Sequence, residues 1–91
     1  MAKVDKILDR WLNNTPTDEP IERVIAILNR FFPDQYEHKR GSHIVVRDER
    51  LIGIQGYGPD GDFDIPVKGG KRVKGWYLKK LAYTIEFLRE A

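Results

Sequence analysis

The chain contains no cysteine and only one methionine among its 91 residues. Without cysteine there is neither a disulfide framework nor a thiolate metal site, so its stability has to come from packing. Apolar runs extend over only a few residues, far short of the roughly 20 that a membrane-spanning helix needs. Lys3, Asp5, Lys6 and Asp9 also interrupt any apolar core of a secretion signal. We therefore expect a cytoplasmic protein.

Signatures of several enzyme classes are also missing. Ser42 is the only serine and has no nucleophile-elbow motif around it. The G-x-x-x-x-G-K-[S/T] pattern of a nucleotide-binding P-loop is absent. Asp60, Asp62 and Asp64 alternate along a glycine-rich loop, but the closing glutamate of an EF-hand loop is missing. We predict neither a metal nor a cofactor, and interpret these aspartates as polar residues of turns and strand edges.

The chain does contain enough hydrophobic (41%) and charged (33%) residues for one folded domain. Its net charge of +2 conceals an asymmetry along the sequence. Residues 1–37 carry five basic and seven acidic side chains, whereas residues 38–91 carry eleven basic and seven acidic ones. No acidic residue occurs from Ile65 to Ile85, which indicates either a polyanionic partner or a solvated positive face. The basic residues in that window are Lys68, Lys71, Arg72, Lys74, Lys79 and Lys80.

Apolar spacing predicts three helices and three strands. Helices are expected over residues 4–12, from near Pro20 to before Pro33, and from about Gly75 to Arg89. Either Asp18 or Glu19 is available to cap the second helix. The buried face expected for the last helix is Leu78, Leu81, Ala82, Ile85 and Leu88.

The strands are expected over residues 35–39, 43–48 and 63–67. Pro66 places the last strand at a sheet edge or at its own end. Residues 51–55 either continue the second strand past a bulge or form a new one, and residues 56–61 form a glycine-rich loop within the sheet. This order predicts an α+β fold in which a three-stranded antiparallel sheet is covered on one face by helices.

His43 is the residue most suited to catalysis, because it follows a basic turn at the start of a strand. The unperturbed pKa of histidine lies near physiological pH, so it can act as general acid or base on a ribose hydroxyl. The alternative is a strand histidine that only packs. His38 lies across the turn, and a hairpin of suitable register would bring the two rings together. Downstream, the Gly69-Gly70 loop precedes a helix whose free amides and dipole favour phosphate.

Two segments carry a family resemblance. Lys-Arg-Gly-Ser-His-Ile-Val-Val-Arg (39–47), followed by Ile-Pro-Val-Lys-Gly-Gly-Lys-Arg-Val-Lys-Gly (65–75), resembles the HicA toxin family, also called YcfA-like. The resemblance spans roughly residues 21–88. It implies a single HicA-like domain over residues 1–91 with a double-stranded-RNA-binding-domain fold. It also implies an endoribonuclease (a hydrolase) that cleaves mRNA as the toxin of a type II toxin-antitoxin system, silenced by a HicB-like antitoxin protein.

Carried over by position, the resemblance makes His43 the catalytic residue. The sequence departs from the family in its extension over residues 1–15, which could extend the core or seat a partner. It also differs in an insertion over residues 52–61 and in Ile44, where many members have a second histidine. These departures leave a non-catalytic RNA-binding or protein-interaction module as the alternative. The candidates for RNA contact are Lys39, Arg40, Gly41, Ser42, Lys68, Lys71, Arg72, Lys74, Lys79 and Lys80.

Overall fold

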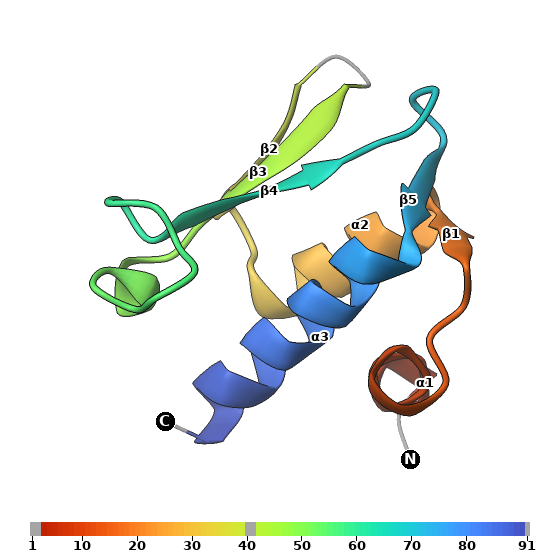
Figure 1. Cartoon of the computed structure of the whole chain (residues 1–91), viewed down its shortest axis with the longest axis horizontal. Helices are drawn as coiled ribbons and strands as arrows, with labels where there is room; N and C mark the ends of the chain where they lie inside the picture. Colours follow the sequence, from red (N-terminus) through yellow and green to blue (C-terminus); the bar gives the residue numbers. More distant parts are fainter. Residues whose placement is uncertain (1–2, 40–41, 91) are drawn as a thin grey trace.

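The computed structural model describes residues 3–39 and 42–90 (Figure 1). It confirms the three expected helices and the three expected strands of an α+β domain, and it adds two short strands. The elements are α1 (Lys3–Asn13), β1 (Asp18–Pro20), α2 (Ile21–Phe31), β2 (Tyr36–Lys39), β3 (His43–Arg47), the 3-10 helix η1 (Glu49–Leu51), β4 (Asp62–Pro66), β5 (Arg72–Lys74) and α3 (Gly75–Glu90). Within residues 3–39 and 42–90, no helix combines the length and apolar character needed to cross a membrane.

The main sheet is antiparallel, with β3 between β2 and β4. Helices α2 and α3 lie on one face of this sheet, and none of the described residues forms a helix over the other face (Figure 1). Cross-strand partners point to the same side of a sheet. Ile44 pairs with His38 and Ile65, so these three positions belong to the helix-covered face. His43 pairs with Lys39 and Pro66, and these three belong to the open face.

Pro66 is the last residue of β4, which forms one edge of the sheet, as the sequence predicts. A proline has no backbone N–H to donate, and this position does not require one.

A second sheet pairs β1 with β5 in antiparallel register, from Asp18 opposite Lys74 to Pro20 opposite Arg72. It joins the segment after α1 to the strand that leads into α3. The expectation that Asp18 or Glu19 caps α2 is wrong, because Pro20 occupies the cap position and no side chain caps the helix. Both acidic residues belong to β1 instead, where Asp18 bonds to Arg72 and Glu19 bonds to Trp11 and to Arg23 in the first turn of α2.

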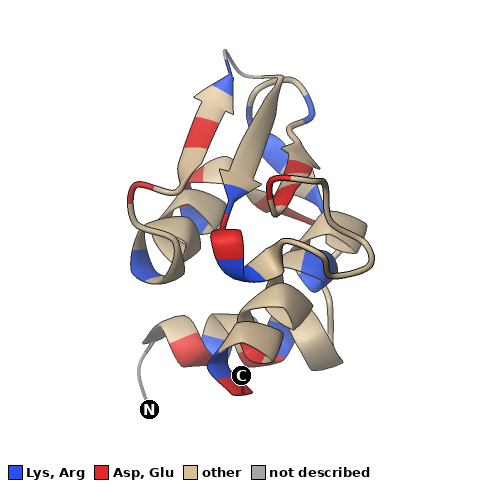
Figure 2. Cartoon of the chain, turned by 90° about the vertical axis from the view of Figure 1, so that its left-hand side faces the viewer, with Lys and Arg blue, Asp and Glu red and all other residues tan. Residues whose placement is uncertain are grey.

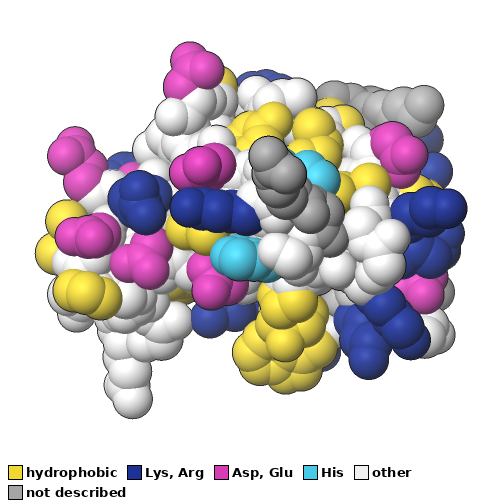
Figure 3. Space-filling view, turned by 90° about the horizontal axis from the view of Figure 1, so that it is seen from above, with side chains coloured by type: hydrophobic (Ala, Val, Ile, Leu, Met, Phe, Trp, Pro, Cys, Tyr) yellow, Lys and Arg dark blue, Asp and Glu magenta, His cyan; other side chains and the backbone are white. Residues whose placement is uncertain are grey.

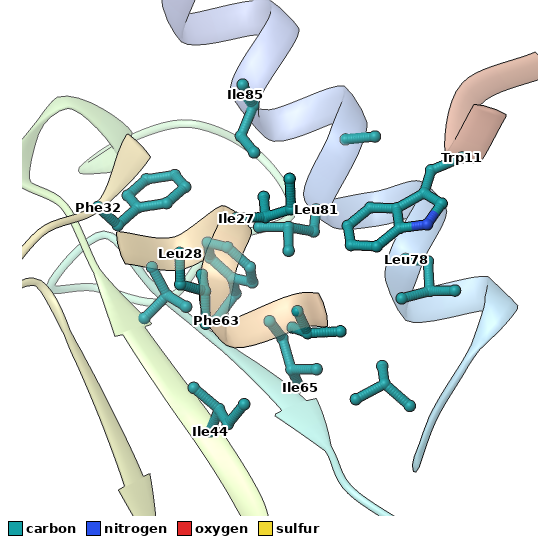
Figure 4. Packing of buried hydrophobic residues seen from close by; sticks show 14 of the residues in the cluster. Trp11, Ile27, Leu28, Phe32, Ile44, Phe63, Ile65, Leu78, Leu81 and Ile85 are labelled. Carbon is teal, nitrogen blue, oxygen red and sulfur yellow. The ribbon is translucent and has the colours of Figure 1, made fainter. Parts of the chain in front are cut away.

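The hydrophobic core lies between the covered face of the main sheet and the helices (Figure 4). The expected face of α3 is buried throughout. Leu8 and Trp11 of α1 are 2% and 0% exposed, and Trp11 lies beside Leu78 of α3 in Figure 4. Residues 3–13 therefore extend the core, which is one of the two roles open for the N-terminal extension.

A buried polar network anchors α1 to β1. The indole Nε1 of Trp11 donates a hydrogen bond to Oε2 of Glu19 at 3.0 Å. Arg23, one turn into α2, donates to both carboxylate oxygens of Glu19 at 3.2 and 3.3 Å. Glu19 is only 4% exposed, and a buried carboxylate is tolerated because its oxygens have these partners. The network links α1 to β1 and to the first turn of α2.

The segment between β3 and β4 differs from the prediction. Neither a continued strand nor a new one forms over residues 51–55, so that expectation is wrong; η1 and turns occupy the segment. Asp48 caps η1 by accepting a bond from the Arg50 backbone amide at 2.9 Å. Gly61 has φ +72°, and a side chain there would collide with the Asp48 carbonyl. The glycines of the loop therefore permit a close return of the chain to Asp48.

Asp48 is expected to make folding stability depend on pH at the acid end. Its carboxylate is buried and accepts bonds from the Arg50 guanidinium, which lower the pKa of Asp48 below its ordinary value. A depressed folded-state pKa stabilises the protein above the unfolded pKa of about 3.9, and this contribution is lost as pH falls through the folded value. We expect Asp48→Asn to lower the free energy of unfolding at pH 7 by about 1–2 kcal/mol.

Urea unfolding at pH 7 and at pH 2.5 measures this contribution. The difference between parent and variant should shrink at the lower pH. A difference of the same size at both pH values would contradict the assignment.

Candidate nucleic-acid interface

His43 begins β3 on the open face of the main sheet, where its side chain is half-buried. Lys39 of β2 lies opposite it on one side and Pro66 of β4 on the other. Seen from above, both histidine side chains of the protein are at the surface (Figure 3). The ring of His43 is therefore not enclosed in the hydrophobic core, and a ligand on the open face can reach it.

The Ser42 hydroxyl lies next to the His43 ring. Ser42 Oγ is 3.0 Å from the Lys39 carbonyl and 2.9 Å from Nδ1 of His43. Its single hydrogen can go to either partner, so both tautomers of a neutral ring fit this contact. When Oγ donates to Lys39, Nδ1 carries the ring hydrogen and Nε2 has the lone pair that can accept a proton.

His38 does not join His43. It pairs with Ile44 in the register of β2 and β3, so it belongs to the opposite face of the sheet. The hypothesis of a two-histidine pair depends on a register that the hairpin does not adopt, and it is therefore wrong. The two histidines differ in environment although both are accessible, and His38 offers a matched control for His43.

The Gly69-Gly70 loop is a tight hairpin turn that leads into β5. Gly69 and Gly70 have φ of +60° and +71°, and two successive positive φ values are typical of a type I′ turn, which glycine favours. The amide of Lys71 donates to the Lys68 carbonyl at 3.1 Å, and the amide of Gly75 donates to Thr17 at 2.8 Å. The Lys71 and Gly75 amides are therefore engaged within the fold and do not serve a phosphate.

The hairpin lies close to the His43 turn. The amide of Val67 donates to the Ser42 carbonyl at 3.0 Å, directly joining the two segments. Lys68, Lys71 and Lys74 on the hairpin are exposed. Basic side chains are most frequent on the right of Figure 3, which is the side of β1 and β5 in Figure 1, and acidic ones are most frequent on the left.

Several of the predicted RNA-contact residues already have partners. Arg72 donates two hydrogen bonds to Asp18, which lower the pKa of Asp18 and raise that of Arg72. Lys39 pairs with Glu37 at 3.5 Å. Both ion pairs are exposed, so they are weak and a phosphate could replace the carboxylate. Arg40 and Gly41 lie outside the described residues.

Lys80 is oriented differently from Lys79, although both are predicted RNA-contact residues. Lys80 Nζ donates to the Gly56 carbonyl at 3.1 Å and lies 5.3 Å from the centre of the Tyr57 ring. Lys79 is exposed beside Trp76, in a shallow surface hollow that Tyr57 and Tyr83 also line. The exposed aromatic residues of this hollow were not predicted as site residues. Their sequence signal would have been the seven-residue spacing of Trp76 and Tyr83.

The open face of the sheet carries charges of both signs. Glu37 and Asp64 pair with Val45 from its two sides, so they share this face with His43. Figure 2 likewise shows both acidic and basic positions on the strands of this sheet. Asp62, at the start of β4, accepts a bond from the Asp60 amide at 3.2 Å. The alternating aspartates thus occupy a turn and an edge strand, in agreement with their interpretation from sequence.

No family model matches the chain, and no solved structure matches it. It is similar to a pentatricopeptide repeat-containing protein of Arabidopsis thaliana, with 34% identity over 70 residues. The match covers 70% of this chain but only 10% of that protein, so the chain spans about a tenth of its relative's length. Pentatricopeptide modules are helical repeats, whereas the described residues here include five strands. The similarity therefore carries no argument about the fold or activity of this chain.

Proposed function

We propose that this protein is a HicA-like toxin that binds and cleaves mRNA in the cytoplasm, with His43 as general base. The observation that carries the proposal is the position of the His43 ring: it lies on the open face, beside the Ser42 hydroxyl and next to the basic hairpin. The resemblance of residues 39–47 and 65–75 to that family supports the same residue. The sheet with helices on one face is compatible with the double-stranded-RNA-binding-domain-like architecture that we propose.

The proposed reaction starts at a ribose 2′-hydroxyl. Nε2 of His43 takes the hydroxyl proton while the 2′-oxygen attacks the adjacent phosphorus. The bond from phosphorus to the 5′-oxygen breaks, and the leaving oxygen receives a proton from water or a second group. The products are a 2′,3′-cyclic phosphate and a free 5′-hydroxyl. This chemistry needs no metal, because the nucleophile belongs to the substrate.

The hairpin lysines would hold the substrate by its phosphates. Lys68, Lys71 and Lys74 are exposed next to the Ser42–Val67 contact, so an RNA backbone lying over them would pass close to the His43 turn. Phosphate contacts position a nucleic acid without reading its sequence. The resemblance adds a HicB-like antitoxin, which would silence the toxin by covering the open face and keeping RNA from His43.

The test is RNA cleavage by the purified full chain. Single-stranded RNA should be cut to fragments with 2′,3′-cyclic phosphate and 5′-hydroxyl ends. The same RNA with 2′-O-methyl groups should remain intact, because it has no proton for Nε2 to accept and no free nucleophile. Absence of cleavage would refute the nuclease proposal. Fragments with 3′-hydroxyl ends would refute the role of His43 in activating the 2′-hydroxyl.

A non-catalytic module that binds RNA or protein is the second candidate function. The acidic residues Glu37 and Asp64 on the open face favour it, because they lower the positive potential that a polyanion would meet near His43. Such a module would bind RNA in a salt-sensitive manner without cutting it, and Lys71→Ala together with Arg72→Ala would weaken that binding.

A further inference from the structure

Helix α3 carries apolar side chains on its outer side as well as on its buried side. Among the described residues, four large apolar side chains are exposed, and three of them belong to α3: Trp76 (69%), Tyr83 (58%) and Phe87 (46%). At about 100° per residue, these three positions fall within about 40° of one another. They form a stripe along the helix, opposite its buried face. An exposed apolar patch of this kind marks an interaction surface.

The stripe has the spacing of a helix-packing seam. Residues 76, 80, 83 and 87 are separated by four, three and four positions, the alternation of two helices that pack along their length. Lys80 occupies the second position; its amino group donates to the Gly56 carbonyl and lies 5.3 Å from the centre of the Tyr57 ring and 5.9 Å from that of Trp76. The seam therefore presents the hydrocarbon stem of Lys80 and an ammonium group held over the Trp76 ring.

The charges beside the stripe are self-complementary. Lys79 and Glu86, seven residues apart, lie on the same flank, with a basic side chain in the N-terminal half and an acidic one in the C-terminal half. Glu86 also lies 3.5 Å from Arg89 of its own helix, an exposed and therefore weak ion pair that Lys79 of a second copy could replace. If a second α3 packs antiparallel across a two-fold axis, Trp76 meets Phe87 of the other copy and Lys80 meets Tyr83. The same two-fold axis places Lys79 of each copy opposite Glu86 of the other copy, which gives two equivalent ion pairs. A two-fold interface requires this kind of self-complementary patch.

We infer that the outer stripe of α3 binds a second copy of this chain in an antiparallel arrangement. This inference does not depend on the proposed nuclease activity. RNA fits the stripe less well, because Glu86 and Glu90 flank its C-terminal half and the Lys80 amino group is already engaged. One 16-residue helix from each copy makes a small interface, so association should depend on protein concentration.

Sedimentation equilibrium of the full chain from micromolar to millimolar concentration tests the inference. The parent should pass from monomer to dimer across this range. Tyr83→Glu should raise the dissociation constant by more than about 30-fold, the effect of losing a central aromatic contact. Ile52→Glu is the matched control, because Ile52 is also exposed (54%) but lies outside α3, and it should leave the dissociation constant unchanged.

A charge exchange tests the antiparallel arrangement itself. Lys79→Glu should weaken association, because it places two carboxylates opposite each other, and Lys79→Glu combined with Glu86→Lys should restore it. A parent that stays monomeric at every concentration overturns the inference. If, in addition, single-stranded RNA quenches Trp76 fluorescence, the stripe stacks bases instead. A dimer that Ile52→Glu disrupts and Tyr83→Glu does not would also overturn it.

Discussion

Replacing His43 by alanine is expected to lower the rate of RNA cleavage by about 10²–10⁴-fold, the contribution typical of a positioned proton-transfer group. The side chain is half-buried at the start of β3 and lies on the open face, so the fold should persist. Single-turnover cleavage of a labelled RNA measures the change, with circular dichroism as the check on folding. Ser42→Ala should have a smaller effect, because the ring remains but loses the hydroxyl that contacts Nδ1.

His38→Ala is the matched control for this experiment. It removes an accessible histidine five residues away, but from the opposite face of the same hairpin. Its cleavage rate should equal that of the parent. Equal losses in the two variants would indicate a general effect on the hairpin and would remove His43 from its proposed role. RNA binding that survives His43→Ala while cleavage is lost would separate recognition from chemistry.

Replacing Trp11 by alanine is expected to lower the free energy of unfolding by about 3–5 kcal/mol, the cost of deleting a large aromatic side chain from a packed core. Trp11 lies on α1, is 0% exposed and belongs to the hydrophobic core. Its indole also donates a hydrogen bond to the buried Glu19 carboxylate. The variant thus combines a cavity with a lost hydrogen bond to a buried charge. A domain of this size is only about 5–15 kcal/mol stable, so much of its stability should be lost.

Chemical unfolding monitored by far-ultraviolet circular dichroism measures this loss. Ile52→Ala provides the control, because an exposed apolar residue outside the core should change stability by no more than about 0.5 kcal/mol. A Trp11→Ala variant as stable as the parent would mean that α1 is an appendage rather than part of the core.

Most of the helices and strands were predicted correctly because the sequence pattern of each is contained within its own residues. The three helices have apolar side chains at helical spacing, and β3 is rich in β-branched residues. The strands β1 and β5 had no such signal. Asp-Glu-Pro is a poor strand sequence, and its pairing with Arg72–Lys74 is made across more than 50 residues. The failed strand at residues 51–55 has a related cause, since the Asp48 cap and the return of the chain at Gly61 determine that segment.

For the candidate site, too, some features were predicted from the sequence and others were decided by the tertiary structure. Sequence pattern and family resemblance identified His43 and the basic hairpin without any coordinates. The register of β2 and β3 then placed His43 on the open face and His38 on the other, which no count of residues across the turn could decide. Residues distant in sequence also reduce the positive charge of the basic segment. Residues 65–85 contain no acidic residue, yet Asp18 forms an ion pair with Arg72.

The amino-acid sequence alone determined the α+β class, the helices and the edge position of Pro66, since each depends on neighbours within a few residues. Together with the family resemblance, it proposes His43 as the catalytic residue. Tertiary structure alone decided that α1 belongs to the core, that His43 and His38 lie on opposite faces of the sheet and that α3 exposes a second apolar face. These features depend on which surfaces meet after the chain has closed long loops. Side-chain chemistry can be read along a chain, but the partner of each side chain is set by packing.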